Sequence, residues 1–313
     1  YAGILISVII ASIGSGFIEL LVSPIVDLLP SETKASSMSL LHAFYCWGVV
    51  VVVSVSTLFL WFIGNERWFI LPVFWSIVPI ITAVMFSVVP LPLPVSQTEQ
   101  GKVGTKGIFK SSVYLLAAYV MFAGAVAELS MAQWTSYFAE VGLGVSKVVG
   151  DVAGPCLFAF MMAVGRMCHG LFGEKLDMKK LLLILSSFTV LCYIITIIAP
   201  LPVFSLIGCG LSGIGVSIMW PGMLNMCADD YPRAGASMFA ILALGGDIGC
   251  SVGPYLMGSV SDAVGKSESF ATIGASWGLL PEQIGLRAGF SASLIFPVFM
   301  ILGVALLRKK VNR

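Results

Sequence analysis

Three acidic residues lie within long apolar runs of the sequence, where a charged side chain is costly. Glu19, Glu128 and Asp247 each stand in a run long enough to cross a bilayer, which takes about 20 apolar residues. An ionised side chain at the bilayer centre costs roughly 2.5–3.5 kcal/mol on insertion scales, so such residues usually face a cavity or a partner. A carboxyl group removed from water can carry a proton near neutral pH. The three residues are therefore candidates for proton and solute binding.

Glu19 belongs to a polar stripe in the first apolar run. Ser12, Gly16, Glu19, Ser23 and Asp27 follow at intervals of four, three, four and four, which places them on one face of a helix. Such a stripe predicts a helix that lines a polar cavity, with Glu19 binding a proton. The alternative is that Glu19 makes a structural hydrogen bond between helices.

A histidine follows in the second run. His42 shares a helical face with Ser39 and Cys46, and Tyr45 is adjacent to that face. A neutral imidazole can donate a hydrogen bond to a solute hydroxyl or relay a proton. His42 and Tyr45 are therefore candidates for the same site, and the alternative for His42 is a purely structural hydrogen bond.

Further candidates lie in the second part of the chain. Glu128, Gln133 and Trp134 bring an acid, an amide and an indole ring close together, a set that suits a polar ring-shaped ligand. The alternative for Trp134 is packing near the membrane interface. Asp247 follows two glycines and is expected to contact the solute or pair with a cation, and Asn225 is a further cavity candidate.

The composition decides which elements must position these residues. The chain has 313 residues, of which 58% are hydrophobic and 11% charged, with a mean hydropathy of +1.01. An ordinary soluble domain has about 25% charged residues, and a nucleic-acid binder needs a basic excess that a net charge of +1 does not give. The seven cysteines form no C-x-x-C pair, and no nucleotide or zinc-protease motif is present. We therefore expect an all-α polytopic membrane protein, not an enzyme, without a cofactor or metal.

Nine apolar runs have the length of membrane-spanning helices. The expected ranges are 1–29, 38–63, 68–90, 111–138, 149–172, 179–199, 202–226, 236–260 and 287–307. Alternate connections, beginning with the one after the first run, hold thirteen of the 17 Lys and Arg residues, and the opposite set holds Arg67, Lys147, Lys266 and Arg287. By the positive-inside rule the first set is cytoplasmic, so the C-terminus is expected inside and residue 1 outside.

A short internal repeat predicts two halves. Asp27 begins an Asp-x-x-Pro motif followed by Ser37-Met38, and Asp229 begins the same motif, followed by Ser237-Met238. Four predicted spans separate the second copy from the polar segment 91–110, and one span precedes the first copy. We therefore expect a chain from a twelve-span protein that lacks the first three helices, with residues 1–90 from the first half, 91–110 as the central cytoplasmic loop and 111–313 as a six-helix half. A genuine nine-span protein is the alternative.

A cytoplasmic connection of the second half carries a family signature. Gly170–Lys180 resembles the loop pattern G-x-x-x-D-R-x-G-R-K-K of the major facilitator superfamily, with Glu174 in place of Asp, Lys175 in place of Arg and Asp177 in place of the second Gly. The resemblance implies that charged residues at the cytoplasmic helix ends hold one conformation and separate in the other. The candidates for this gating role are Asp27, Arg166, Glu174, Lys175, Asp229 and Arg233; setting topology alone is the alternative.

A narrower resemblance involves the first two spans. Gly16–Pro24 is similar to the fourth-helix pattern G-x-x-E-x-x-x-N-P of fucose-permease-like sugar:proton symporters, with Ser23 in place of Asn, and Leu40–Gly48 is similar to their fifth helix. Gly124 and Glu128 fit their seventh-helix pattern G-x-x-x-E. The resemblance implies that Glu19 takes part in proton coupling and substrate binding.

Together these observations predict a secondary transporter that works by alternating access in the cytoplasmic membrane. Its expected partners are a small polar solute (a sugar), H⁺ and the lipid bilayer; no nucleic acid is expected, and the protein is expected to be monomeric. An efflux carrier for organic or drug-like solutes is the alternative, and a sensor with a transporter fold is a further one.

Overall fold

The computed structural model describes residues 2–29, 34–90, 112–172, 176–230 and 236–311, and the regular elements within them are helices. This part of the chain holds nine helical segments that are long and apolar enough to cross a membrane. They confirm the predicted all-α membrane fold and lie close to the predicted ranges: Ala2–Val26, Ser36–Ile63, Ile70–Val88, Tyr114–Gly142, Lys147–Phe172, Met178–Ile198, Pro202–Cys227, Met238–Gly265 and Pro281–Leu307. The protein is therefore a multi-pass membrane protein.

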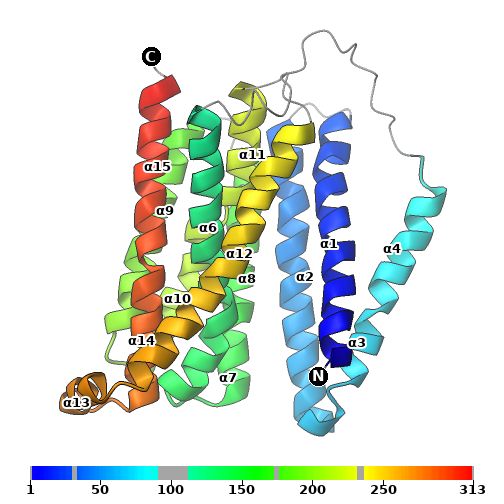
Figure 1. Ribbon diagram of the computed structural model, residues 1–313. Helices are drawn as coiled ribbons and strands as arrows, with labels where there is room; N and C mark the ends of the chain where they lie inside the picture. The colour runs from blue at the N-terminus through cyan, green and yellow to red at the C-terminus, as the bar shows by residue number, and fades with distance from the viewer. Residues whose placement is uncertain (1, 30–33, 91–111, 173–175, 231–235, 312–313) are drawn as a thin grey trace.

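The helices form two groups that lie side by side (Figure 1). The first group holds α1 (Ala2–Leu28), α2 (Lys34–Ile63), the short 3-10 helix η1 (Asn65–Arg67), α3 (Ile70–Trp75) and α4 (Ile77–Val88). We call the end of the bundle where α1 ends and α2 begins the upper end, because it is at the top of Figure 1; the opposite end is the lower end.

The second group is the larger one. Its elements are α6 (Ser112–Tyr137), the π-helical turn η2 (Phe138–Gly142), α7 (Lys147–Asp151), the π-helical turn η3 (Val152–Cys156), α8 (Leu157–Phe172), α9 (Met178–Ile198), α10 (Pro202–Val216), α11 (Met219–Asp230), α12 (Ala236–Gly265), α13 (Glu268–Ser276), α14 (Pro281–Ser293) and α15 (Ile295–Val311). The short helix α13 projects sideways at the lower end, and α15 ends at the upper end (Figure 1).

Prolines account for the breaks inside three spans. A proline has no N–H, and its ring clashes with the carbonyl group four residues earlier. The helices α3 and α14 end at Trp75 and Ser293, which stand four residues before Pro79 and Pro297. In the same way, α10 ends just before Ser217, four residues before Pro221. Each of these spans is therefore built from two consecutive helices.

Small residues let the helices of the second group pack closely. A Cβ atom at Gly249 of α12 would collide with the Phe122 carbonyl oxygen of α6, and one at Gly213 of α10 would collide with the Phe158 carbonyl oxygen of α8. Close approach at glycine is the usual way in which membrane helices associate without a hydrophobic driving force. Accordingly, 72% of the residues in an 18-residue apolar stretch of the α10–α11 span are buried, whereas none is buried in the corresponding stretch of α1.

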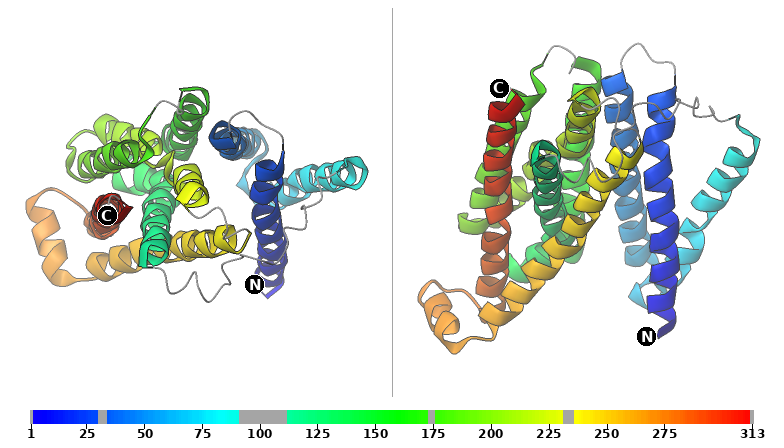
Figure 2. Two further views of the ribbon diagram at one scale, coloured as in Figure 1. Left: turned by 90° about the horizontal axis from the view of Figure 1, so that it is seen from above. Right: turned by 45° about the horizontal axis from the view of Figure 1, so that its top comes forward.

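Helices α1 and α2 make the main contacts between the groups. Helix α2 packs against α8 and also contacts α7, η3 and α11, and α1 packs against α12. Figures 1 and 2 show that α12 starts beside α1 and slants away from it, so that the two helices are far apart at the lower end. We call the contact of α2 with the span Lys147–Phe172, which comprises α7, η3 and α8, the α2–α8 seam, and the contact of α1 with α12 the α1–α12 seam.

Candidate functional site

A pocket lies where the two groups meet beside the α1–α12 seam. Its volume is about 300 Å³ when the space open to the outside is counted, but only about 20 Å³ of it admits the centre of a water molecule. Four helices line it with Glu19, Leu20 and Ser23 (α1), His42 (α2), Trp220 and Leu224 (α11), and Phe239 and Ala243 (α12). Glu19 is the one acidic residue of this lining, so the pocket combines a carboxyl group, an imidazole and two aromatic rings.

Other carboxyl groups approach Glu19 from the second group of helices. Asp247 of α12 and Glu128 of α6 are both close enough to Glu19 to interact with it electrostatically, and Cys250 is within such range of all three. Asp247 is exposed, whereas Glu128 is only 4% exposed. The structure thus gathers the three intramembrane acids that the sequence singled out around one region between the groups.

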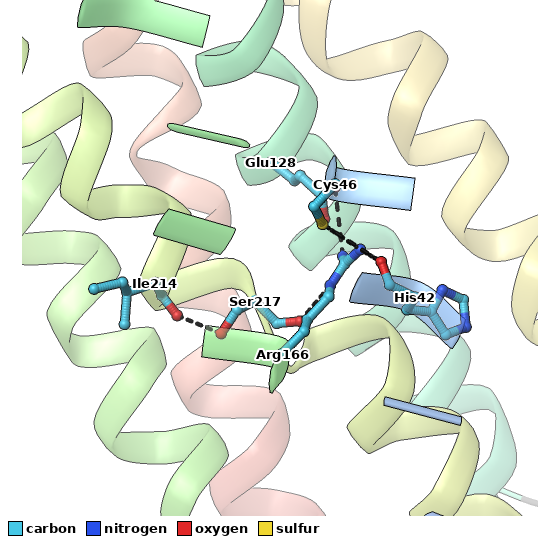
Figure 3. Close-up of polar contacts among 6 residues, drawn as sticks. All are labelled: His42, Cys46, Glu128, Arg166, Ile214 and Ser217. Atoms are coloured by element: carbon cyan, nitrogen blue, oxygen red, sulfur yellow. Dashed lines mark hydrogen bonds and ion pairs between the residues drawn. The ribbon is translucent and has the colours of Figure 1, made fainter. Parts of the chain in front are cut away.

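A buried arginine stands next to this region, as Figure 3 shows. Arg166 of α8 is 2% exposed, and its Nη2 lies 3.8 Å from Oε1 of Glu128. Its Nη1 donates to the His42 carbonyl oxygen at 2.9 Å and contacts Cys46 Sγ at 3.0 Å. Its Nε donates to the Ser217 carbonyl oxygen at 2.8 Å. One guanidinium group therefore contacts α2 of the first group and α6 and the α10–α11 break of the second.

The sequence explains why Arg166 finds an acceptor at the α10–α11 break. In a continuous helix the Ser217 carbonyl would accept a hydrogen bond from the N–H of residue 221, but that residue is proline. A buried carbonyl without a partner is costly, and Arg166 supplies the missing donor. Gly165 brings α8 close enough, because a Cβ atom at this position would collide with Ser217 Oγ.

Further polar contacts follow the α2–α8 seam on both sides of Arg166. Toward the upper end, Ser39 Oγ donates to the Arg166 carbonyl oxygen at 2.8 Å and lies 3.1 Å from His169 Nδ1. Ser36 Oγ donates to the Gly170 carbonyl oxygen. Toward the lower end, Thr57 Oγ1 donates to Asp151 Oδ2 at 3.2 Å. Between these contacts, Trp47 Nε1 donates to Met167 Sδ at 3.2 Å, and Ser54 Oγ lies 3.4 Å from Cys156 Sγ. The seam is therefore bonded at several levels of the membrane.

The structure separates some residues that the sequence placed together. Trp134 donates from Nε1 to the Pro254 carbonyl oxygen at 3.1 Å and lines a different pocket at the lower end, and Gln133 is exposed. Tyr45 is 58% exposed, and Asn225 is partly buried on α11. None of these four residues lines the Glu19 pocket.

The position of Arg166 differs from the expectation. The sequence placed it at a cytoplasmic helix end, but it lies six residues before the end of α8, roughly 9 Å along the helix axis. Burial is possible there because Glu128 and two carbonyl oxygens surround the guanidinium group. The spacing of Ser217 and Pro221 was a signal in the sequence that a carbonyl group needed a partner.

The remaining gating candidates fall largely outside the described residues. Glu174, Lys175 and Arg233 are not among them. Asp27 and Asp229 lie near the ends of α1 and α11 at the upper end of the bundle, and the description there covers only the backbone. Their gating role stays a prediction.

Two solved structures are similar to this chain. One is a variant of the E. coli fucose:proton symporter FucP, with a TM-score of 0.58 and 17% identity over 90% of this chain and 73% of that chain. The other is FucP as a transporter in the outward conformation, with a TM-score of 0.57 and 16% identity over 90% and 72% of the two chains. Both similarities show the fold. A comparison with curated proteins finds no match.

The family of the protein follows from its sequence. The family model of the Major Facilitator Superfamily matches residues 1–254, most of the chain. The nine membrane-spanning segments and the fold of both similar structures agree with this match. The chain therefore belongs to the Major Facilitator Superfamily of membrane transporters.

Proposed function

We propose that this transporter moves a small polar solute of the sugar class across the cytoplasmic membrane by alternating access, together with protons. The observation that carries the proposal is the position of Glu19: it is an acid in an apolar span, and it lines a pocket between the two groups of helices. A site between two bodies is what alternating access requires. The similar structures, which are those of a fucose:proton symporter, support this choice of solute and ion.

The pocket offers a distinct role to each kind of side chain. Glu19 binds and releases the proton, and Glu128 and Asp247 influence it through their charge. The His42 imidazole, whose Nε2 is buried without a hydrogen-bond partner among the described residues, donates to a solute hydroxyl. The rings of Trp220 and Phe239 supply the apolar surface on which a sugar ring packs.

The two groups of helices serve as the moving bodies in this proposal. Residues 1–90 form one body, residues 111–313 form the other, and residues 91–110 connect them on the cytoplasmic side. The distribution of Lys and Arg supports a cytoplasmic upper end, which places the C-terminus inside. Asp27, Asp229, Arg233, Glu174 and Lys175 would make charge contacts there in one conformation. We propose that the protein works as a monomer.

Transport in proteoliposomes tests the role of Glu19. The purified protein is reconstituted, and uptake of radiolabelled L-fucose and a panel of other monosaccharides is measured with and without an imposed pH gradient. Glu19→Gln keeps the shape and removes the titratable group. We expect this variant to lose accumulation driven by the pH gradient and to retain exchange of solute at equal concentrations, because exchange needs no net proton movement.

Glu66→Gln is the matched control, because Glu66 is exposed in η1 and lies outside the pocket. It should accumulate solute like the unmodified protein. If Glu19→Gln accumulates solute as fast as Glu66→Gln, Glu19 is not the coupling residue. If no monosaccharide enters under any gradient, the sugar class is wrong for this protein.

A further inference from the structure

Arg166 is the residue of α8 that bonds both groups of helices at once. Its Nη1 donates to the His42 carbonyl oxygen of α2, at 2.9 Å, and its Nε donates to the Ser217 carbonyl oxygen, at 2.8 Å. Its own backbone carbonyl oxygen accepts from Ser39 Oγ of α2 at 2.8 Å. These contacts lie in the part of the α2–α8 seam nearer the upper end, six residues before α8 ends.

The positive charge of Arg166 is balanced by a single nearby carboxylate within the described part of the chain. Glu128 Oε1 lies 3.8 Å from Nη2, and Glu128 Oε2 is buried without a hydrogen-bond partner among the described residues. Both side chains are almost fully buried, at 2% and 5% exposed. Breaking a buried ion pair by neutralising one partner leaves the other charge uncompensated, which is strongly destabilising.

Glu128 does not line the transport pocket but lies within electrostatic range of Glu19, which does. The titratable and charged groups near it come from four helices: Glu19 of α1, Tyr45 and Cys46 of α2, Arg166 of α8 and Cys250 of α12. A proton or a solute that reaches the Glu19 region therefore acts on Glu128 as well. Glu128 therefore interacts by charge with Glu19 of the pocket and forms an ion pair with Arg166 of the seam.

We propose that Arg166 is a charge-controlled latch between α2 and α8. Ionised Glu128 holds Arg166 in the seam and so keeps α2 packed against α8 near the upper end. Neutralisation of Glu128 releases Arg166. The proposal rests on the transport function proposed above and adds the step that connects the pocket to the movement of the two bodies. With Glu128 neutral, the buried guanidinium has no countercharge, so conformations in which water reaches it become more populated. Because this part of the seam is nearer the upper end, release opens the site toward the upper side. The Thr57–Asp151 contact remains below as the pivot.

The chain carries its own reporter for this opening. Cys46 lies at the latch and is 0% exposed, whereas Cys168 is exposed on α8. The rate at which N-ethylmaleimide modifies each residue is measured by peptide mass spectrometry on the purified protein in detergent, without solute. Cys46 reacts only when the seam opens, and Cys168 reports the general reactivity of α8.

Glu128→Gln imitates the neutral acid. We expect it to speed modification of Cys46 relative to Cys168 by roughly a hundredfold or more, the lower bound for losing a buried countercharge. Glu140→Gln is the matched control, because Glu140 follows in η2 and is exposed; its ratio should equal that of the unmodified protein. Glu128→Asp keeps the charge and should stay much closer to the unmodified protein than Glu128→Gln.

A second variant covers the case in which Glu128→Gln does not fold. Arg166→Lys keeps the buried charge but has one nitrogen in place of the three that contact Ser217, His42 and Glu128, so it too should speed modification of Cys46. Unchanged Cys46 rates in the folded variants, Arg166→Lys included, would overturn the latch. No transport is measured in this experiment, so its failure leaves the sugar:proton proposal intact, and failure of the uptake assay leaves the latch intact.

Discussion

The two seams between the helix groups differ in how tightly their side chains pack and in how many hydrogen bonds cross them. The α2–α8 seam is closed by side chains that hydrogen-bond at several levels, with Ser39 and Cys46 fully buried in it. The α1–α12 seam instead borders a pocket, and an 18-residue apolar stretch of α1 contains no buried residue. A transporter needs one contact that guides the movement and another that gives way to the solute. In the proposals above, the lower part of the α2–α8 seam guides the movement, and its upper part and the α1–α12 seam give way.

The largest difference should come from added bulk in each seam. Ser39→Leu places a larger apolar side chain where no space exists and removes the bonds to Arg166 and His169. Overpacking costs about 1–3 kcal/mol, so we expect a clear fall in the melting temperature of the purified protein in detergent.

Ser23→Leu is the matched variant in the other seam, because Ser23 is 8% exposed and lines the pocket. Its added atoms point into a pocket that opens to the outside, so its melting temperature should change much less while solute uptake is blocked. Equal losses of stability in the two variants would remove the distinction between the seams.

The lower level of the α2–α8 seam should be the weaker one. Thr57→Val removes one hydrogen bond to Asp151, which keeps its contacts with Ser136 and Lys147. One such bond contributes about 0.5–1.5 kcal/mol. Thr57→Ser keeps the hydroxyl group and should melt like the unmodified protein. A loss for Thr57→Val as large as that for Ser39→Leu would place the main fastening at the lower end.

The hydrogen bond between Trp134 and Pro254 lies inside the second group of helices, so its loss is a reference for the stability effects in the two seams. Trp134→Phe removes the hydrogen bond from Nε1 to the Pro254 carbonyl oxygen and leaves an aromatic ring in place of the indole. We expect a cost of less than about 1 kcal/mol and an unchanged half-saturation concentration for uptake. A large rise in that concentration would mean that Trp134 binds the solute, as its spacing from Glu128 suggested.

The smallest effect belongs to a helix end outside both seams. Asp177 caps α9 by accepting from the backbone N–H groups of Lys179 and Lys180, and the hydrogen bond from Lys180 holds the pKa of this exposed carboxyl below its ordinary value. A carboxyl with a lowered pKa stabilises the fold at neutral pH, and this contribution is lost as the pH falls through the lowered pKa. We expect faster amide hydrogen exchange at Lys180 in Asp177→Ala at neutral pH, little change in Asp177→Asn, and unchanged uptake in both. Equal exchange at Lys180 in Asp177→Ala and the unmodified protein would contradict the capping role.

The sequence predicted the spans well because a bilayer imposes a length and a polarity on every helix that crosses it. It also predicted a polar face on α1, and Glu19 and Ser23 of that face line the pocket. It placed Arg166 at a helix end because an arginine in a span is costly, and the groups that offset this cost come from three other helices. The same limit applies to Trp134 and Gln133: both follow Glu128 closely in the chain, but a helix turns successive side chains toward different neighbours.

The partners of Arg166 also arrive in a definite order during biosynthesis. Chains emerge from the ribosome N-terminus first, so Glu128 and the His42 carbonyl precede Arg166, and only Ser217 follows. When α8 leaves the translocon, a countercharge and one acceptor can already be in the lipid. A circular permutant that began at α8 would insert its arginine before either of them, and we expect cellular quality control to degrade much more of that chain.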